Sequence, residues 1–342
     1  MDLLPTQDQI DIAEAAANVL ASRLPIKVIR ERRHLATAYP LDAWLSCANT
    51  GLLGLGLPES LGGAGCGVQE EALLFREIGR HLAPGPFLST VLAGHVAVAA
   101  GDDQLAAGIA AGDIRVGHVL IEHDAVDPGA GLSGSITVQD WDGTEYLLVV
   151  TPAGAGLVRT ASVGDVESYR SIDWGVRLGR AEATNAPFTA WVGSGDAAVF
   201  NRGMVLVAAQ LTGIAEATRD MSVAYAMTRE QFGRPIGTNQ AVKHFCANMA
   251  VDAQRACAQL FLAAASADAG APDAEFQTLA AKVVATDAAQ ANADLNIQIH
   301  GGMGFTTEFD GHLFVERVRI LEHAVGSRYD SLAAIIALPS AQ

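Results

Sequence analysis

The spacing of hydrophobic residues changes twice along the chain, and these changes divide it into three parts. Up to about residue 114 the apolar positions recur with a helical period. The expected helical segments are Gln7–Ser22, Asp42–Asn49, Gln69–His81 and the Ala-rich Phe87–Ala111. Between them, GLLGLGLPESLGGAG at residues 51–65 forms a turn-rich loop, because its Gly and Pro residues interrupt the helical pattern. We therefore expect an N-terminal helical domain over residues 1–114.

Residues 115–195 carry short apolar runs that are typical of strands. The runs are RVGHVLI, GSITVQD, TEYLLVVT, GAGLVRTASV and APFTAWVG. Asp142-Gly143 lies between the second and third runs and predicts a hairpin turn there. This segment predicts a small, β-barrel-like middle domain over residues 115–198.

The helical period returns at about residue 199 and predicts a bundle of long helices. The first helix presents one apolar face: Met204, Val207, Ala208, Leu211 and Ile214. A second helix, with Thr238 or Asn239 as its N-cap, presents another: Val242, Phe245, Met249, Ala253 and Ala256. A third runs from about Asp273 to His300 and stops at Gly301-Gly302, where glycine favours a left-handed cap. The connections are short, so we expect an antiparallel four-helix bundle over residues 199–342 and a mainly α fold.

Composition narrows the classes of function. Hydrophobic residues make up 50% of the chain, yet we find no run of about 18 uncharged apolar residues, so we expect no membrane partner. A net charge of −16 argues against nucleic acid as a partner. The acidic, amphipathic start lacks the basic segment of a targeting peptide, so we expect a cytoplasmic protein. Neither a disulfide framework nor a metal site is expected from the scattered Cys47, Cys66, Cys246 and Cys257.

Two stretches of the bundle carry candidate chemistry. They are YAMTREQFGRPIGTNQAVKH at 225–244 and QIHGGMGF at 298–305, each at the end of a helix. Arg229 offers a planar, permanently charged fork suited to a diphosphate, and Gln298 can donate and accept hydrogen bonds. The glycines allow a ligand to approach the backbone. Taken singly, each stretch is better explained as a helix cap, with Arg229 as a solvated charge; their order and long separation favour a shared site.

Together with LGLGLPESLGGAG, the TRxQFGxPI and QxxGGxG stretches resemble the acyl-CoA dehydrogenase family of flavoproteins over nearly the whole chain. The resemblance implies α,β-dehydrogenation of an acyl-CoA thioester, with FAD as hydride acceptor and an electron-transfer flavoprotein as final acceptor. It also implies dimers that share their FAD sites. The residues that would contact the adenine and diphosphate end of FAD across the interface are Arg229, Gln231, Phe232, Gln240, Gln298, Gly301 and Gly302.

The chain departs from the family pattern where the flavin ring should be held. A Thr-Glu-containing loop and a Trp-containing strand of the middle domain normally contact the ring. Here only Glu122 and Trp141 stand in the corresponding places. We therefore expect that this chain does not hold a flavin ring of its own.

The family's catalytic base is a glutamate that removes the α-proton. In most members it lies in the final helices, where aligning AAIIA (333–337) places Gly326; in others it lies on the first bundle helix, at Gly203. Glycine offers no proton acceptor, so we assign no catalytic residue. The possible substitutes are Glu322 and Asp330, each four residues from Gly326, and the less favoured His323 and His300.

This pattern resembles the subunit without a base in heteromeric (α2β2) actinobacterial acyl-CoA dehydrogenases, which degrade sterol or steroid side chains. By that resemblance, a homologous catalytic chain supplies the base and the ring contacts, and this chain completes the FAD diphosphate end. Two alternatives stay open at this point. One is a self-sufficient homo-oligomeric dehydrogenase with a displaced base, and the other is a non-enzymatic acyl-CoA-binding or scaffold protein.

Overall fold

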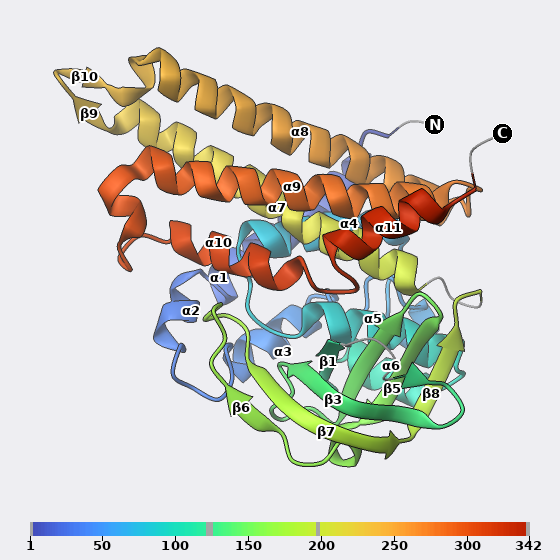
Figure 1. The fold of residues 1–342 in the computed structure, drawn as a ribbon. Helices are drawn as coiled ribbons and strands as arrows, with labels where there is room; N and C mark the ends of the chain where they lie inside the picture. Colours follow the sequence, from blue (N-terminus) through green and yellow to red (C-terminus); the bar gives the residue numbers. More distant parts are fainter. Residues whose placement is uncertain (1–2, 121–125, 196–198, 340–342) are drawn as a thin grey trace.

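The computed structural model describes residues 3–120, 126–195 and 199–339. Its order of elements confirms the expected fold class, with N-terminal helices, then a β sheet, then long C-terminal helices (Figure 1). Among the described residues, no helix combines the length and the hydropathy that crossing a bilayer requires.

The described residues of the N-terminal part, from Leu3 onward, form six α-helices and a short 3-10 turn. They are α1 Gln7–Arg23, α2 Lys27–Glu31, α3 Leu41–Asn49, the turn Glu59–Leu61, α4 Val68–Arg80, α5 Phe87–Ala99 and α6 Asp103–Ala110. The Ala-rich segment is thus two helices. Gly101 takes a φ of +75° after α5, and the Asp102 carboxylate accepts a hydrogen bond from the Leu105 N–H (3.0 Å) to cap α6.

The β part forms one eight-stranded sheet with the order β6-β7-β3-β1-β4-β5-β8, and β2 pairs with β3. The strands are β1 Val116–Leu120, β2 Val126–Asp127, β3 Gly131–Gln139, β4 Tyr146–Thr151, β5 Gly154–Arg159, β6 Glu167–Tyr169, β7 Leu178–Ala186 and β8 Phe188–Gly193.

The predicted hairpin at Asp142-Gly143 is wrong. A turn does form there, since the Thr144 N–H donates to the Trp141 carbonyl (3.0 Å). However, the strands it connects, β3 and β4, do not pair, because β1 lies between them, antiparallel to β3 and parallel to β4. Glu122 lies outside the described residues.

Three long helices dominate the C-terminal part: α7 Val199–Thr228, α8 Gln240–Asp268 and α9 Ala274–His300. The shorter α10 Gly311–Leu321 and α11 Arg328–Ala337 pack against α9. The predicted face of α7 is buried throughout. The predicted face of α8 is buried only from Met249 onward, and Phe245 is 36% exposed, so the prediction fails for the first turns of this helix.

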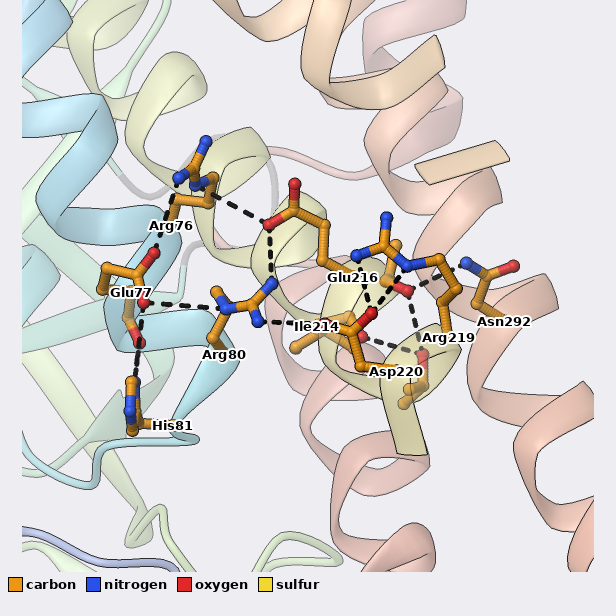
Figure 2. Close-up of polar contacts among 11 residues, drawn as sticks. Arg76, Glu77, Arg80, His81, Ile214, Glu216, Arg219, Asp220 and Asn292 are labelled. Carbon is orange, nitrogen blue, oxygen red and sulfur yellow. Dashed lines mark hydrogen bonds and ion pairs between the residues drawn. The ribbon is translucent and has the colours of Figure 1, made fainter. Parts of the chain in front are cut away.

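The junction between the N-terminal helices and the bundle depends on close contact between α4 and α7. A Cβ at Gly213 would lie 2.0 Å from the Arg76 carbonyl oxygen, and one at Gly79 would lie 2.0 Å from the Gln210 carbonyl oxygen. Only glycine allows this approach. Around the crossing, Arg80 pairs with Glu216 (3.1 Å) and Asp220 (3.0 Å) of α7 (Figure 2). The junction therefore combines backbone contact with a half-buried ionic network.

Candidate functional site

Both motif stretches come together at one end of the bundle, where α7 ends, α8 begins and α9 ends (Figure 1). The His300 ring lies between the rings of Tyr225 and Phe309, with centroid distances of 4.1 Å to each. Its Nδ1–H donates to the Asn296 carbonyl (2.8 Å), and burial lowers the pKa of the imidazole, which keeps it neutral. His300 therefore packs the end of α9 against α7.

A short hairpin extends from the end of α7. It consists of β9 Glu230–Gln231 and β10 Arg234–Pro235, joined by Phe232 and Gly233 at positive φ (+54° and +75°). The Phe232 side chain is 99% exposed at the tip. The exposed Arg229 guanidinium has no hydrogen-bond or ion-pair partner among the residues that the structure describes. The hairpin thus presents a free cation beside an uncovered aromatic ring.

The neighbouring backbone is equally open. A Cβ added at Gly301 or Gly302 would meet nothing within 4 Å, and Gln298 is exposed. Gly301 has the predicted positive φ (+59°), but its ψ of −134° leads into the 3-10 turn Gly301–Phe305 rather than a left-handed helical cap. Asn239 occupies the N-cap position of α8, yet its side chain makes no cap hydrogen bond and accepts from Arg234 instead (3.1 Å).

This donor set fits an anionic cofactor. Arg229 supplies a charge, the glutamines supply amides, and the start of α8 adds the positive end of a helix dipole. The same helix ends and turns carry exposed apolar side chains: Val223, Met227, Phe245, Met303 and Phe305. Exposed apolar side chains together with polar donors favour an interaction site. In the described part of this chain these donors and apolar side chains lie on an exposed surface and not in an enclosed pocket.

The two glycines at the expected base positions each lie beside the chain neighbour of the other, with Gly203 buried and Gly326 half-buried. A Cβ at Gly203 on α7 would lie 3.1 Å from Val325 Cγ1 and 3.2 Å from Leu92 Cδ1. A Cβ at Gly326 would lie 3.4 Å from Met204 Cε. The nearest atoms to both positions are therefore hydrocarbon, and Val325, Leu92 and Met204 are all buried.

The candidate substitute acids are engaged elsewhere. The Asp330 carboxylate accepts hydrogen bonds from the Ser327 N–H (2.9 Å) and hydroxyl (2.7 Å), which caps α11. Glu322 lies 3.8 Å from Arg319, with its side chain 26% exposed. His323 is exposed. None of these groups supplies the atoms nearest to Gly203 or Gly326.

Sequence reasoning missed Lys282 of α9. This lysine is fully buried, and its ammonium donates to the carbonyls of Leu321 (2.8 Å) and Ala324 (2.9 Å), at the end of α10. Burial lowers its pKa to about 7, against the opposing effect of Glu322. The available signal was a single cation within the apolar run AAKVVA.

A cavity of about 50 Å³ lies where the three parts of the chain meet, beside the end of α10. Gln139 Nε2 and Arg317 Nη2 have no hydrogen-bond partner among the described residues, and both residues line it. Burial lowers the pKa of His118 there to about 4 and raises that of Asp140 to about 6. A water needs roughly 10–15 Å³ by this measure, so the cavity has room for a few waters and not for a flavin ring.

No group of three or more His, Cys, Asp or Glu residues that could hold a metal ion occurs in the described part of the chain. Its four cysteines are free thiols.

Comparisons with known proteins define the class. The family model "Acyl-CoA dehydrogenase, N-terminal domain" matches residues 6–108, and "Acyl-CoA dehydrogenase, C-terminal domain" matches residues 196–337. The chain belongs to the acyl-CoA dehydrogenase family. This family consists of FAD-dependent oxidoreductases, and the resemblance inferred from TRxQFGxPI and QxxGGxG is thereby confirmed.

Two curated relatives come from Mycobacterium tuberculosis. Acyl-CoA dehydrogenase IpdE2 is 30% identical over 319 residues, covering 92% of each chain. Acyl-CoA dehydrogenase FadE34 is 33% identical over 308 residues, covering 88% of this chain. This chain spans 43% of the length of FadE34.

Two solved structures share the fold over almost the whole chain. The ChsE4-ChsE5 complex from Mycobacterium tuberculosis superposes with a TM-score of 0.87 at 25% identity, covering 99% of this chain and 100% of that one. A variant of the Tcur3481-Tcur3483 steroid ACAD has the same TM-score at 26% identity, covering 96% of each chain.

Proposed function

We propose that this chain is the subunit without a catalytic base in a heteromeric, FAD-dependent acyl-CoA dehydrogenase of the cytoplasm. It supplies one half of the site for the adenine and diphosphate end of FAD to a homologous catalytic chain. The substrate is an acyl-CoA thioester with a steroid-derived acyl group. An electron-transfer flavoprotein accepts the electrons.

The observation that carries this proposal is the pair of glycines at the base positions. A general base must come within about 3 Å of the proton that it removes. Among the described residues, the atoms nearest to both positions are side-chain carbons of Val325, Leu92 and Met204, which supports the proposal that no carboxylate of this chain acts as the base there. In this proposal the proton acceptor comes from another chain.

The exposed end of the bundle supports the second half of the proposal. Arg229 would pair with the diphosphate, and Gln231, Gln240 and Gln298 would donate or accept hydrogen bonds around it. Gly301 and Gly302 would leave room for the cofactor, and Phe232 would cover its apolar part. When bound, FAD supplies the hydride acceptor for the β-hydrogen of the substrate.

The exposed end of the bundle, where the described residues leave the Phe232 ring uncovered and the Arg229 guanidinium unpaired, supports a partner chain. A ring that is 99% exposed and a guanidinium without a partner gain little in water, whereas a second surface would bury one and pair the other. Two structural neighbours carry paired names, ChsE4-ChsE5 and Tcur3481-Tcur3483, and the second is called a steroid ACAD. These names motivate both the heteromeric assembly and the substrate class.

Expression of the chain alone and together with homologous dehydrogenase chains tests the proposal. We expect the chain alone to reduce no acceptor dye with any acyl-CoA, and the correct pair to do so with a steroid acyl-CoA. Activity of the chain alone would establish the self-sufficient alternative. Assembly without flavin or activity in any combination would establish the scaffold alternative.

A further inference from the structure

We infer that Val325 and Gly203 form a plug and socket that closes the substrate space of this chain, so that an acyl group can bind only in the partner. This inference rests on the proposed function. A base acts on an atom within hydrogen-bond reach. A carboxylate on residue 203 would have to reach the carbon that loses the proton through the space beside Gly203, which is the space that Val325 fills.

The backbone of the plug is strained. Val325 has a φ of +57°, in the left-handed region, where a β-branched residue is a genuine outlier. Such strain persists only where the surrounding structure determines the conformation, and it gathers at functional positions. Here the strained conformation directs the Val325 side chain inward, where the residue is only 3% exposed.

The socket is formed by the missing side chain of Gly203. The Val325 methyl groups lie 3.1 and 3.3 Å from the position that a Gly203 Cβ would take, closer than ordinary van der Waals contact. Leu92 Cδ1 closes the other side at 3.2 Å. Any side chain at residue 203 would compete with Val325 for the same space. The glycine on α7 therefore matches the plug in shape.

Two further contacts hold the plug in place. On one side, the buried Lys282 ammonium binds the carbonyls of Leu321 and Ala324, directly before Val325. On the other, Arg328 binds the two carboxylate oxygens of Asp287 on α9 (2.6 and 3.0 Å), directly after the turn. Both ends of the turn thus contact α9, and these contacts favour the position of Val325 against Gly203.

In this inference the chain differs from an active dehydrogenase in two ways: the glutamate is replaced, and Val325 closes the substrate space. Returning a carboxylate to residue 203 leaves the space beside it occupied by Val325, and the acyl group has no room there. Val325 is therefore a specificity-determining residue, because it decides which of two homologous chains accepts the substrate.

The first test is a thermal-unfolding series on the purified chain with Gly203→Ala, Val325→Ala and both changes. Gly203→Ala should lower the melting temperature in the wild-type background, because the new methyl meets Val325. In the Val325→Ala background it should lower the melting temperature less, because only the close contact with Leu92 Cδ1 remains and alanine favours the helix. The same shift in both backgrounds would overturn the plug and socket.

The second test measures binding of butyryl-CoA and of free CoA to the chain by calorimetry. The wild-type chain should show no preference between them. Val325→Gly keeps the positive φ without strain and opens the space, so it should bind butyryl-CoA about tenfold more tightly than CoA. A preference in the wild type, or none in Val325→Gly, would overturn the inference. Neither measurement uses flavin or activity, so failure here is distinct from failure of the proposed function.

Discussion

The two ends of α7 differ in their exposure to solvent. Near its start, Gly203 is enclosed by hydrocarbon. Just beyond its last residue, Arg229 extends into solvent. A helix of 30 residues is about 45 Å long, so the two regions are far apart. The comparison teaches that the side chains at the first end are packed within the chain, whereas the donors and apolar side chains at the second end are left exposed by the described residues.

The two ends of α7 contribute differently to the stability of the folded chain. At the buried end the chain accepts a strained valine and a desolvated lysine, and the surrounding packing offsets both. At the exposed end Arg229 and Phe232 contribute little to folding, because they make few contacts. Substitutions at the first end should therefore change folding, and substitutions at the second should change cofactor binding and assembly.

The largest effect is expected for Gly203→Glu. The carboxylate would be placed against Val325 and Leu92 without a hydrogen-bond partner, so we expect the free energy of unfolding to fall by about 4 kcal/mol or more. We expect no dehydrogenase activity from the variant. Urea titration measures the first and an acceptor-dye assay the second.

The matched control is Gly302→Glu at the exposed end, where a side chain meets open space. It should change stability by no more than about 0.5 kcal/mol. Equal losses in the two variants would remove the distinction between the ends.

Lys282→Met comes next. The two carbonyls that the ammonium binds would lose their donor, and a buried unpaired carbonyl costs about 1–3 kcal/mol, so we expect a loss of about 3 kcal/mol. Lys243→Met, on the exposed start of α8, should be nearly neutral. Urea titrations of both variants against the wild type measure the difference, and a neutral Lys282→Met would contradict the account.

The difference in the free energy of unfolding between the wild type and Lys282→Met should depend on pH, because the pKa of Lys282 is lowered. The pKa is about 7 in the folded chain against an ordinary 10.5, so between these values the unfolded chain binds the extra proton. The free energy of unfolding of the wild type should therefore rise relative to Lys282→Met from pH 7 towards pH 10. The slope is at most about 1.4 kcal/mol per pH unit. A flat or falling difference would show that the ammonium is not desolvated.

Arg229→Ala should leave the folding of the chain unchanged, because the guanidinium has no partner among the described residues. In the assembled complex it should weaken FAD binding by about ten- to a hundredfold, the contribution of a hydrogen bond to a charged group. Flavin absorbance after gel filtration measures retention, with Lys243→Ala as a control for the lost charge. Full flavin retention would exclude Arg229 from the cofactor site.

Phe232→Ala should also leave the stability of the chain nearly unchanged, since the ring is 99% exposed. Its effect on assembly should be larger, at about 2 kcal/mol, as for an aromatic residue that anchors an interface. Phe276→Ala, at the start of α9 and 44% exposed, serves as the aromatic control. Unchanged association of the Phe232 variant would show that the partner does not contact the hairpin.

Local signals predicted most of the fold. The helical periods of α1, α4, α7, α8 and α9 and the strand runs all correspond to observed elements. The hairpin at Asp142-Gly143 failed because a turn sequence specifies local geometry, whereas the insertion of β1 between β3 and β4 depends on pairing between distant segments. The exposed start of α8 failed for a related reason, because periodicity identifies an apolar face and does not say which molecule covers it.

Sequence signals likewise predicted one part of the candidate site and missed the other. The residues at the exposed end lie in motifs that are contiguous in sequence, so a cofactor role could be predicted for them from the chain alone, and it stays a prediction. The plug at the buried end could not, because Gly203, Leu92 and Val325 are widely separated in sequence, and the strain at Val325 is a property of the folded backbone. Lys282 was missed because its partners are backbone carbonyls, which leave no mark in the sequence.

The flavin-to-subunit ratio tests the central claim most directly. We would purify the chain alone and in complex with the homologous chain that activates it, and measure flavin absorbance against protein concentration. The account predicts a colourless chain alone and one FAD for each pair of chains in the complex. A chain that is yellow by itself, with one FAD per subunit, would contradict it.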